Sequence, residues 1–175
     1  GLVVDRFGDY LSAQLTTAAM DQRCDVVIAA LDEVFSPKGI VFRNQGPFRQ
    51  MEGLPEAVEV AAGDVPDLVE LEENGARFLA PVMTGQKTGW FYDHRINRQQ
   101  LQQLSKDKTV LDVYSYVGGW GVQAAVAGAK AVTCVDVSGD ALDLAQQNAE
   151  LNNYSGQFSC LQGKANDIMK ALIDA

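Results

Sequence analysis

The chain has 175 residues, of which 47% are hydrophobic and 21% are charged, and its formal net charge is −9. This composition is typical of a soluble globular protein with a sizeable core, and the excess of acids argues against a segment that grips a nucleic-acid backbone by itself. No stretch approaches the roughly 20 apolar residues of a membrane span, and the charged start is unlike a secretory signal. We therefore expect a cytoplasmic protein with no membrane partner.

The first block, residues 1–78, predicts a small α/β domain. Its opening apolar run predicts a strand, and the stretch from Thr17 to residue 35 predicts one helix with Thr17 as its N-cap. Residues 40–44 predict a strand, whereas the Pro- and Gly-containing stretch 48–67 predicts a loop. The apolar residues at helical spacing are Val26, Val27, Ala30, Leu31 and Val34.

Two alternating runs predict a β-hairpin around Asn74 and Gly75. This dipeptide suits a type I′ turn, in which both central residues have positive φ. A polar loop punctuated by glycines follows, and a helix is expected from about Asp93. The hairpin closes the first block, and residues 79–175 form the second.

From residue 109 onward the chain alternates three times between a strand and a helix. The strands "TVLDVY" and "AVTCVDV" are rich in apolar residues, as expected of strands buried on both faces. Ser138 is the expected N-cap of the second helix, with Leu142, Ala145 and Ala149 on one face. This order predicts parallel strands with right-handed crossovers in a doubly wound sheet.

The stretch "DVYSYVGGWG", residues 112–121, predicts a ligand site at the turn after the first of these strands. Ligands of doubly wound sheets bind at the carboxyl ends of strands, and glycine lets backbone approach a ligand closely. Asp136 ends the next strand and is placed to accept the hydroxyl hydrogens of a ribose. The pattern therefore indicates a cofactor that contains a nucleoside.

The glycine spacing distinguishes between cofactors. The loop is S-x-x-G-G-x-G rather than G-x-G-x-x-G, and no Lys follows the glycines as in a phosphate-binding Walker loop. A carboxylate at Asp112 would repel a pyrophosphate but favour an ammonium or sulfonium group. S-adenosylmethionine has both cations and a ribose. The alternative is an ordinary strand–turn–helix that binds nothing.

Three segments together resemble one family. "SPKGIVFRN", "EENGARFLAPVMTGQKTGWFYDHR" and "VLDVYSYVGGWG" are similar to the large-subunit ribosomal RNA cytosine-5 methyltransferase I family, within the class I S-adenosylmethionine-dependent methyltransferases. The resemblance implies a Rossmann-like fold, S-adenosylmethionine as cofactor and ribosomal RNA as partner. It also implies the middle domain (1–78) and the cofactor-binding half (79–175) of a longer enzyme that has an RNA-binding PUA domain first.

The resemblance also assigns site residues. A lid before the first strand would lie beside the cofactor, the glycine loop would surround its methionine end, and the second strand would hold its ribose and adenine. Arg95 would suit the methionine carboxylate, although local pairing of Arg95, N-capping by Asp93 and plain packing of Tyr116 and Trp120 are alternatives. In that order the residues are Lys87, Thr88, Phe91, Asp93 and Arg95; Asp112, Ser115, Tyr116 and Gly118; and Asp136, Val137 and Ser138.

Two departures from the family pattern affect these assignments. Lys164 stands in the turn after the third strand, where the family often has an acid near the adenine amine; Asn166 or Asp167 would have to replace it. Cytosine-5 methylation needs a cysteine thiolate, and neither Cys134 nor Cys160 matches the family position. We therefore name no catalytic residue and no metal ligand, and we expect buried, reduced thiols.

Two other functions stay open at this stage. A nicotinamide-dependent oxidoreductase would also use Asp136, and a methyltransferase-like half domain could serve as a non-catalytic interaction module. The resemblance further implies that the strand "TVLDVY" has an open edge. Either the chain self-associates through this edge, or the hairpin at Asn74 and Gly75 covers it.

Overall fold

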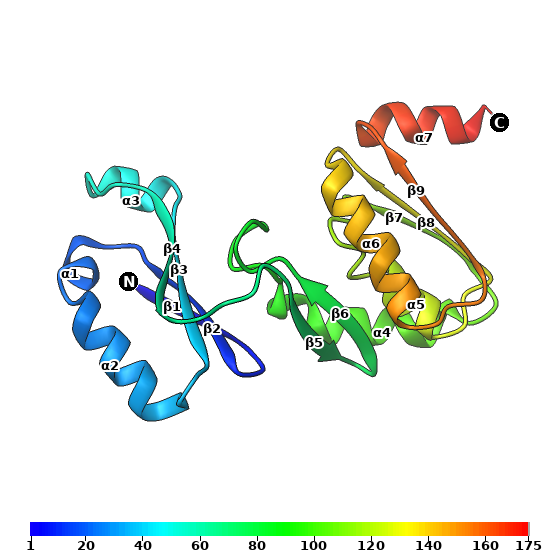
Figure 1. Cartoon of the computed structure of the whole chain (residues 1–175). Helices are drawn as coiled ribbons and strands as arrows, with labels where there is room; N and C mark the ends of the chain where they lie inside the picture. The colour runs from blue at the N-terminus through cyan, green and yellow to red at the C-terminus, as the bar shows by residue number, and fades with distance from the viewer. Residues whose placement is uncertain (175) are drawn as a thin grey trace. The chain divides into compact units, whose positions relative to one another are not determined.

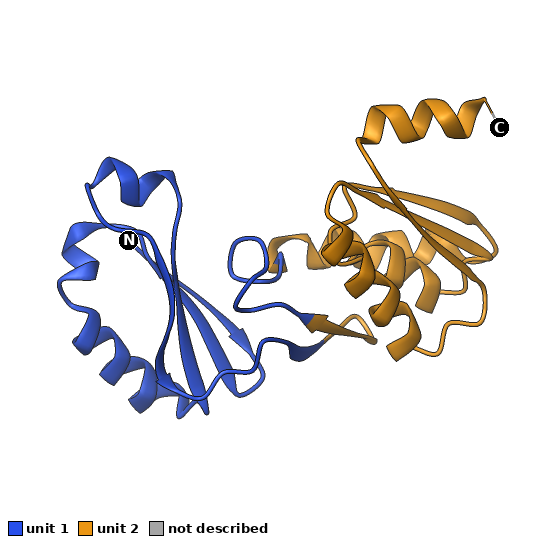
Figure 2. Cartoon of the chain, turned by 45° about the horizontal axis from the view of Figure 1, so that its top comes forward, with its two compact units in different colours: residues 1–71, 80–91 blue, residues 72–79, 92–175 orange. Residues whose placement is uncertain are grey.

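The computed structural model describes residues 1–174 (Figure 1). The chain forms two compact units: unit 1 comprises Gly1–Leu71 and Ala80–Phe91, and unit 2 comprises Glu72–Leu79 and Tyr92–Ala175 (Figure 2). The predicted boundary at residue 78 lies inside the segment Glu72–Leu79, which groups with unit 2, although the next segment, Ala80–Phe91, groups with unit 1. Both units are mixed α/β, as the sequence predicts.

Unit 1 contains a four-stranded sheet of order β1-β2-β3-β4. The strands are β1 (Leu2–Phe7), β2 (Tyr10–Leu15), β3 (Gly39–Asn44) and β4 (Ala57–Gly63), and only β2 and β3 are parallel. The helix α2 (Cys24–Phe35) packs on one face of the sheet. The core of this unit consists of Leu11, Ala13, Leu15, Val27, Leu31, Ile40 and Phe42.

Three expectations for this unit are wrong. The single predicted helix is two helices, α1 (Ala18–Asp21) and α2; Thr17 is the N-cap residue of α1, as predicted, although its side chain makes no capping hydrogen bond. Val26 and Val34 are 66% and 70% exposed, so the buried face of α2 is narrower than its apolar spacing suggests. The predicted loop contains α3 (Pro47–Met51) and β4, which pairs with β3 as an edge strand.

The hairpin is confirmed. It consists of β5 (Val69–Glu73) and β6 (Ala76–Ala80), which form a sheet of their own. Asn74 and Gly75 have φ angles of 54° and 79°, as a type I′ turn requires. Because β7 pairs with β8 alone and the hairpin with neither, the expectation that the hairpin covers the β7 edge is wrong.

Unit 2 contains the predicted parallel sheet, in the order β7-β8-β9. The helices α4, α5 and α6 pack on one face through Leu101, Ala124 and Leu142, which meet Val132 and Cys134 of β8. The elements are η1 (Tyr92–His94), α4 (Arg95–Ser105), β7 (Thr109–Val113), α5 (Gly121–Val126), β8 (Ala131–Asp136), α6 (Gly139–Leu151), β9 (Gln157–Gln162) and α7 (Ala165–Ile173).

The two strands that the sequence predicts to be buried differ in how much of each is buried. The strand β8 is buried over most of its length, as expected. In β7 only Asp112 is buried, and Leu111 is 46% exposed. The prediction of a β7 buried on both faces is therefore wrong, because the structure shows β7 at the edge of its sheet.

Candidate cofactor site

The loop between β7 and α5 has an unusual backbone. Tyr114, Tyr116 and Gly118 have φ angles of 62°, 50° and 77°. Left-handed conformations are uncommon for tyrosine and persist only where surrounding groups hold them. Such alternation orients successive peptide groups toward one side, a geometry that suits the binding of a ligand by backbone groups.

Asp136, at the end of β8, holds this loop through its carboxylate. Oδ2 accepts the N–H of Tyr116 at 2.9 Å, and Oδ1 accepts the N–H of Ser138 at 3.0 Å. A carboxylate offers about four lone-pair positions, so each oxygen can accept one further donor, such as a ribose hydroxyl. The sequence indicated a ligand role for Asp136 but not this structural role.

Asp112 also holds the backbone while keeping carboxylate oxygen that a ligand could use. Its Oδ2 accepts the N–H of Gly121, the first residue of α5, at 2.8 Å. Burial raises the pKa of Asp112 to about 6; the Gly121 N–H lowers it, nearby Asp136 raises it and Arg98 lowers it. Two carboxylates that lie close together in a buried site favour a cation or hydrogen-bond donors over a phosphate.

The glycines of the loop serve internal packing. A Cβ on Gly121 would lie 2.8 Å from Sγ of Cys134 and 3.0 Å from Cγ1 of Val132, so only glycine lets α5 begin this close to β8. A Cβ on Gly118 would lie 3.0 Å from that of Ala145 in α6, and its positive φ also favours glycine. Both glycines shape the loop from within.

Ser115 has a buried hydroxyl without a hydrogen-bond partner among residues 1–174. It lies beside the thiol of Cys134, a weak hydrogen-bonding group that leaves the hydroxyl available for a stronger partner. A buried polar atom without a partner is costly. With the two carboxylates, it gives the loop a donor and acceptor set that fits the polar end of S-adenosylmethionine.

The thiols of this chain are poor nucleophiles. Burial is the main cause that raises the pKa of Cys134, Cys160 and Cys24, and in Cys134 the charge of Asp112 adds to it. A thiol needs to ionise to attack a base. In residues 1–174 no group of three or more His, Cys, Asp or Glu side chains is placed to hold a metal ion.

A buried charged network that the sequence did not reveal supports the loop from α4. Arg98 donates to both oxygens of Glu73, at 2.6 and 3.0 Å, and Gln123 donates to Glu73 Oε1 at 2.8 Å. Asn74 in turn donates to Gln123 at 2.9 Å. The network joins the hairpin to α4 and α5. Its signal in the sequence is weak, because nothing in the pattern of α4 distinguishes the buried Arg98 from the exposed Arg95.

The predicted lid residues Lys87, Thr88 and Phe91 lie in unit 1. The Thr88 hydroxyl donates to the carboxylate of Asp5 in β1, and the Lys87 ammonium lies 4.5 Å from the ring centre of Phe91. The buried guanidinium of Arg43 donates to the carbonyls of residues 82 and 85. Residues 81–91 are thus anchored within unit 1 in two ways: Arg43 donates to their carbonyls, and Thr88 donates to Asp5.

The other predicted contacts lie in unit 2. Asp93 is exposed and lies 3.5 Å from the ring of His94, which occupies the N-cap position of α4, so the alternative that Asp93 is the N-cap is wrong. Arg95 is exposed, and its backbone carbonyl accepts a hydrogen bond from Asn74. No ion pair of its guanidinium is found in residues 1–174, so the alternative of local pairing finds no support there.

The expected adenine side lies beside Asp136. Val137 is 63% exposed, which leaves an apolar side chain available next to the carboxylate. The Ser138 hydroxyl caps α6 by accepting the Ala141 N–H at 3.3 Å, as predicted from the sequence. The turn with Lys164 is close in space, because the Gly163 N–H donates to the Asp136 carbonyl at 2.9 Å.

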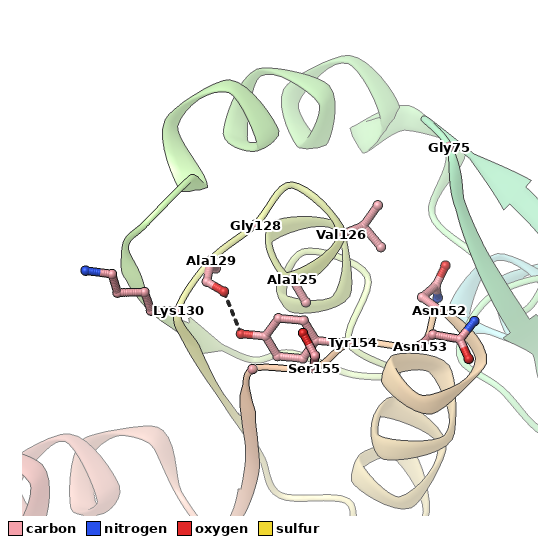
Figure 3. Close-up of a pocket in the computed structure, with 11 residues that line it drawn as sticks. Gly75, Ala125, Val126, Gly128, Ala129, Lys130, Asn152, Asn153, Tyr154 and Ser155 are labelled. Atoms are coloured by element: carbon pink, nitrogen blue, oxygen red, sulfur yellow. Dashed lines mark hydrogen bonds between the residues drawn. The ribbon is translucent and has the colours of Figure 1, made fainter.

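Two cavities border this sheet. One of about 360 Å³ borders the β7 edge and includes Asp112, Tyr114 and Trp120. The other, of about 450 Å³, lies where β8 and β9 begin, and Tyr154 closes its floor by donating to the Ala129 carbonyl at 2.7 Å (Figure 3). The first cavity follows β7 from Val110 to Tyr114, so it lies along the open edge of this strand and reaches the loop only at Tyr114 and Trp120.

Comparison with known proteins identifies the family of the chain. The family model "S-adenosylmethionine-dependent methyltransferase" matches residues 47–170. A ribosomal RNA large subunit methyltransferase I from Aeromonas salmonicida is 38% identical over 98% of this chain and 43% of its own length. The corresponding protein from Pseudoalteromonas atlantica is 37% identical over 99% of this chain and 44% of its own. The chain thus spans about two fifths of the length of these relatives.

A solved structure gives the same result for the fold. A protein described as a methyltransferase and complexed with SAH superposes with a TM-score of 0.86 and 25% identity, over 99% of this chain and 44% of its own. Among residues 1–174, no helix is both long and apolar enough to cross a membrane.

Proposed function

Because the chain belongs to the S-adenosylmethionine-dependent methyltransferase family, we propose that it forms the cofactor-binding part of an enzyme that methylates C5 of a cytosine in large-subunit ribosomal RNA. One observation carries the cofactor assignment: Asp112 and Asp136 hold the strained loop by its N–H groups and leave carboxylate lone pairs for a cationic, ribose-containing ligand. The names of the relatives support the RNA substrate.

In this proposal each part of the site takes one part of the cofactor. Asp136 accepts the ribose hydroxyls, Val137 and Ser138 border the adenine, and Asp112 faces the ammonium, with Ser115 as a further donor. S-adenosylmethionine supplies the electrophilic methyl group. The remaining proposed contacts are Lys87, Thr88, Phe91, Asp93, Arg95, Tyr116 and Gly118.

The proposal also states what this chain does not supply. Attack on C6 of cytosine needs a thiolate, and burial keeps the thiols of Cys24, Cys134 and Cys160 protonated. We therefore expect the 175-residue chain to bind cofactor without transferring a methyl group. Transfer of labelled methyl groups to ribosomal RNA by this chain alone would contradict this assignment.

The proposed partners follow from charge and topology. A net charge of −9 leaves this chain poorly suited to hold RNA by its backbone, so we propose that other parts of the enzyme supply most of that contact. The edge of β7, with Leu111 exposed, is the surface through which we expect the isolated chain to self-associate. Light scattering across a concentration series measures this; a monomer at all concentrations would contradict it.

Calorimetric titration tests the cofactor assignment. We expect S-adenosylhomocysteine to bind and NAD to show no heat above its dilution. Asp136→Ala should weaken binding by on the order of 1–3 kcal/mol, because ribose hydroxyls and two loop N–H groups lose their acceptor. Asp32→Ala, at an exposed position of α2, is the control and should bind as the wild type does. Binding of NAD, or equal affinity in Asp136→Ala, would contradict the proposal.

A further inference from the structure

Asn148 is a fully buried amide in the middle of α6. It shares the inward face of the helix with Ala145 and Ala149. Its Oδ1 accepts the N–H of Leu79 in β6 at 2.7 Å, and its Nδ2 donates to the carbonyl of Val117 in the glycine loop at 3.0 Å. A single side chain therefore joins the outer edge of the hairpin to the loop.

Asn152, one turn later in α6, makes a related contact that does not reach the loop. Its Oδ1 accepts the Arg77 N–H at 2.8 Å, and its Nδ2 donates to the Arg77 carbonyl at 2.7 Å. Four helical residues rise about 6 Å, and two strand residues rise about 6.6 Å. The two asparagines therefore match alternate residues of β6, and they differ in one respect: Asn148 also binds the loop.

The carbonyl of Val117 lies between the two strained positions of the loop. Tyr116 before it and Gly118 after it have positive φ. Such a conformation persists only when neighbouring groups fix the orientation of its peptides. Asp136 fixes the Tyr116 N–H on one side, at 2.9 Å, and the Asn148 amide fixes the next carbonyl.

We infer that Asn148 is a positioning residue for the cofactor loop: its amide holds the Val117 peptide against the edge of β6, and this keeps the loop in its ligand-ready conformation. The inference rests on the proposed function, in which this loop binds S-adenosylmethionine. It requires both halves of the amide, because the Leu79 N–H needs an acceptor and the Val117 carbonyl needs a donor.

The requirement for a donor and an acceptor allows a test by pH. In Asn148→Asp, the protonated acid offers one O–H donor and one acceptor, whereas the carboxylate offers acceptors only. At pH 8, relative to wild type at the same pH, we expect the amides of residues 115–121 to exchange with deuterium on the order of tenfold faster. At pH 5 we expect exchange to return to within about twofold of wild type, because the acid restores the donor.

The matched control is Asn152→Asp, measured at the same two pH values. It should speed exchange in β6 and leave residues 115–121 unchanged, because Asn152 does not contact the loop. Loop exchange that is unaffected in Asn148→Asp, or equally affected in Asn152→Asp, would overturn the inference. If Asn148→Asp does not fold at pH 8, Asn148→Ala and Asn152→Ala give the same comparison at pH 6 without a buried charge.

A cofactor titration separates this inference from the proposed function. We expect Asn148→Asp to bind S-adenosylhomocysteine on the order of ten- to a hundredfold more weakly than wild type at pH 8, with recovery at pH 5 and no change in Asn152→Asp. If the wild type does not bind, the proposed function fails while the exchange contrast still decides the role of Asn148. If the wild type binds and Asn148→Asp binds equally well, the role of Asn148 fails alone.

Discussion

The two segments predicted to contact the cofactor are held in opposite ways. Residues 81–91 in unit 1 are held through their carbonyls by the buried cation of Arg43. The loop 112–121 in unit 2 is held through its N–H groups by the carboxylates of Asp112 and Asp136. Carbonyls of the first segment thus face a cation, whereas N–H groups of the second face two carboxylates.

This difference indicates what each segment can recognise. Around the loop, carboxylate lone pairs remain available, so it suits cations and hydroxyl donors. In the other segment the Thr88 hydroxyl is already used by Asp5, and the ammonium of Lys87 is its exposed charge. The sequence predicts both segments as ligand sites, one from its glycine loop and the other from the family resemblance, and the structure shows which of their groups are already engaged.

The largest expected effect on stability concerns the loop 112–121, which the carboxylates hold. Asp112 has a folded pKa of about 6 against an ordinary value of 3.8, so the folded state binds its proton more tightly than the unfolded state. This contribution to stability is present below about pH 4 and is lost as pH rises through 6, by on the order of 2–3 kcal/mol. Asp112→Asn keeps an acceptor for Gly121 and should be more stable than wild type by that amount at pH 8.

Urea denaturation at pH 4 and at pH 8 measures this effect. The advantage of Asp112→Asn should shrink to about 0.5 kcal/mol at pH 4, because the wild-type carboxyl is then protonated in the folded state and about half protonated in the unfolded state. Asp167→Asn, on exposed α7, should stay within about 0.5 kcal/mol of wild type at pH 8. An Asp112→Asn variant that is less stable than wild type at pH 8 would show that the carboxylate is well solvated in the folded state.

A smaller loss is expected where the loop meets β8. Gly121→Ala should destabilise the fold by about 2 kcal/mol, because its Cβ would lie 2.8 Å from Sγ of Cys134 and the close start of α5 would have to shift. Gly8→Ala, at a position of positive φ with nothing within 4 Å, shows the cost of conformation alone. No loss in Gly121→Ala would mean that the contact with β8 is not tight.

The smallest effect on stability is expected in residues 81–91 of unit 1. Thr88→Val keeps the shape of the side chain but removes the hydroxyl that donates to Asp5. It should lower the free energy of unfolding of unit 1 by about 1 kcal/mol, because one hydrogen bond to a charged group is lost. Thr88→Ser retains the hydroxyl and should recover most of this. Thermal unfolding compares them, and no loss in Thr88→Val would mean that Asp5 does not anchor the segment.

The sequence was informative wherever one element carried its own signal. The strands and helices from residue 109 onward, the cap at Ser138 and the turn at Asn74 depend on spacing within a few residues, and each is confirmed. The exposure of β7 was missed, because apolar content does not indicate whether a strand has a neighbour on both sides.

The residues that sequence reasoning missed make contacts over long separations. Asn148 binds Leu79 from 69 positions away, and Arg98 binds Glu73 from 25 positions away. Periodicity does not reveal such pairs. One signal was present for Asn148: a polar residue beside Ala145 on the apolar stripe of α6, where a buried amide needs partners.

An NMR titration of the ¹⁵N-labelled chain with S-adenosylhomocysteine tests the central claim most directly, because it reports where the ligand binds. The amides of Tyr116, Gly121 and Ser138 donate to the two carboxylates, so their signals should shift most as the ligand engages those oxygens. Signals around the Tyr154 cavity at the opposite ends of the strands should stay in place. Shifts confined to the Tyr154 cavity, with none at the loop, would contradict the account.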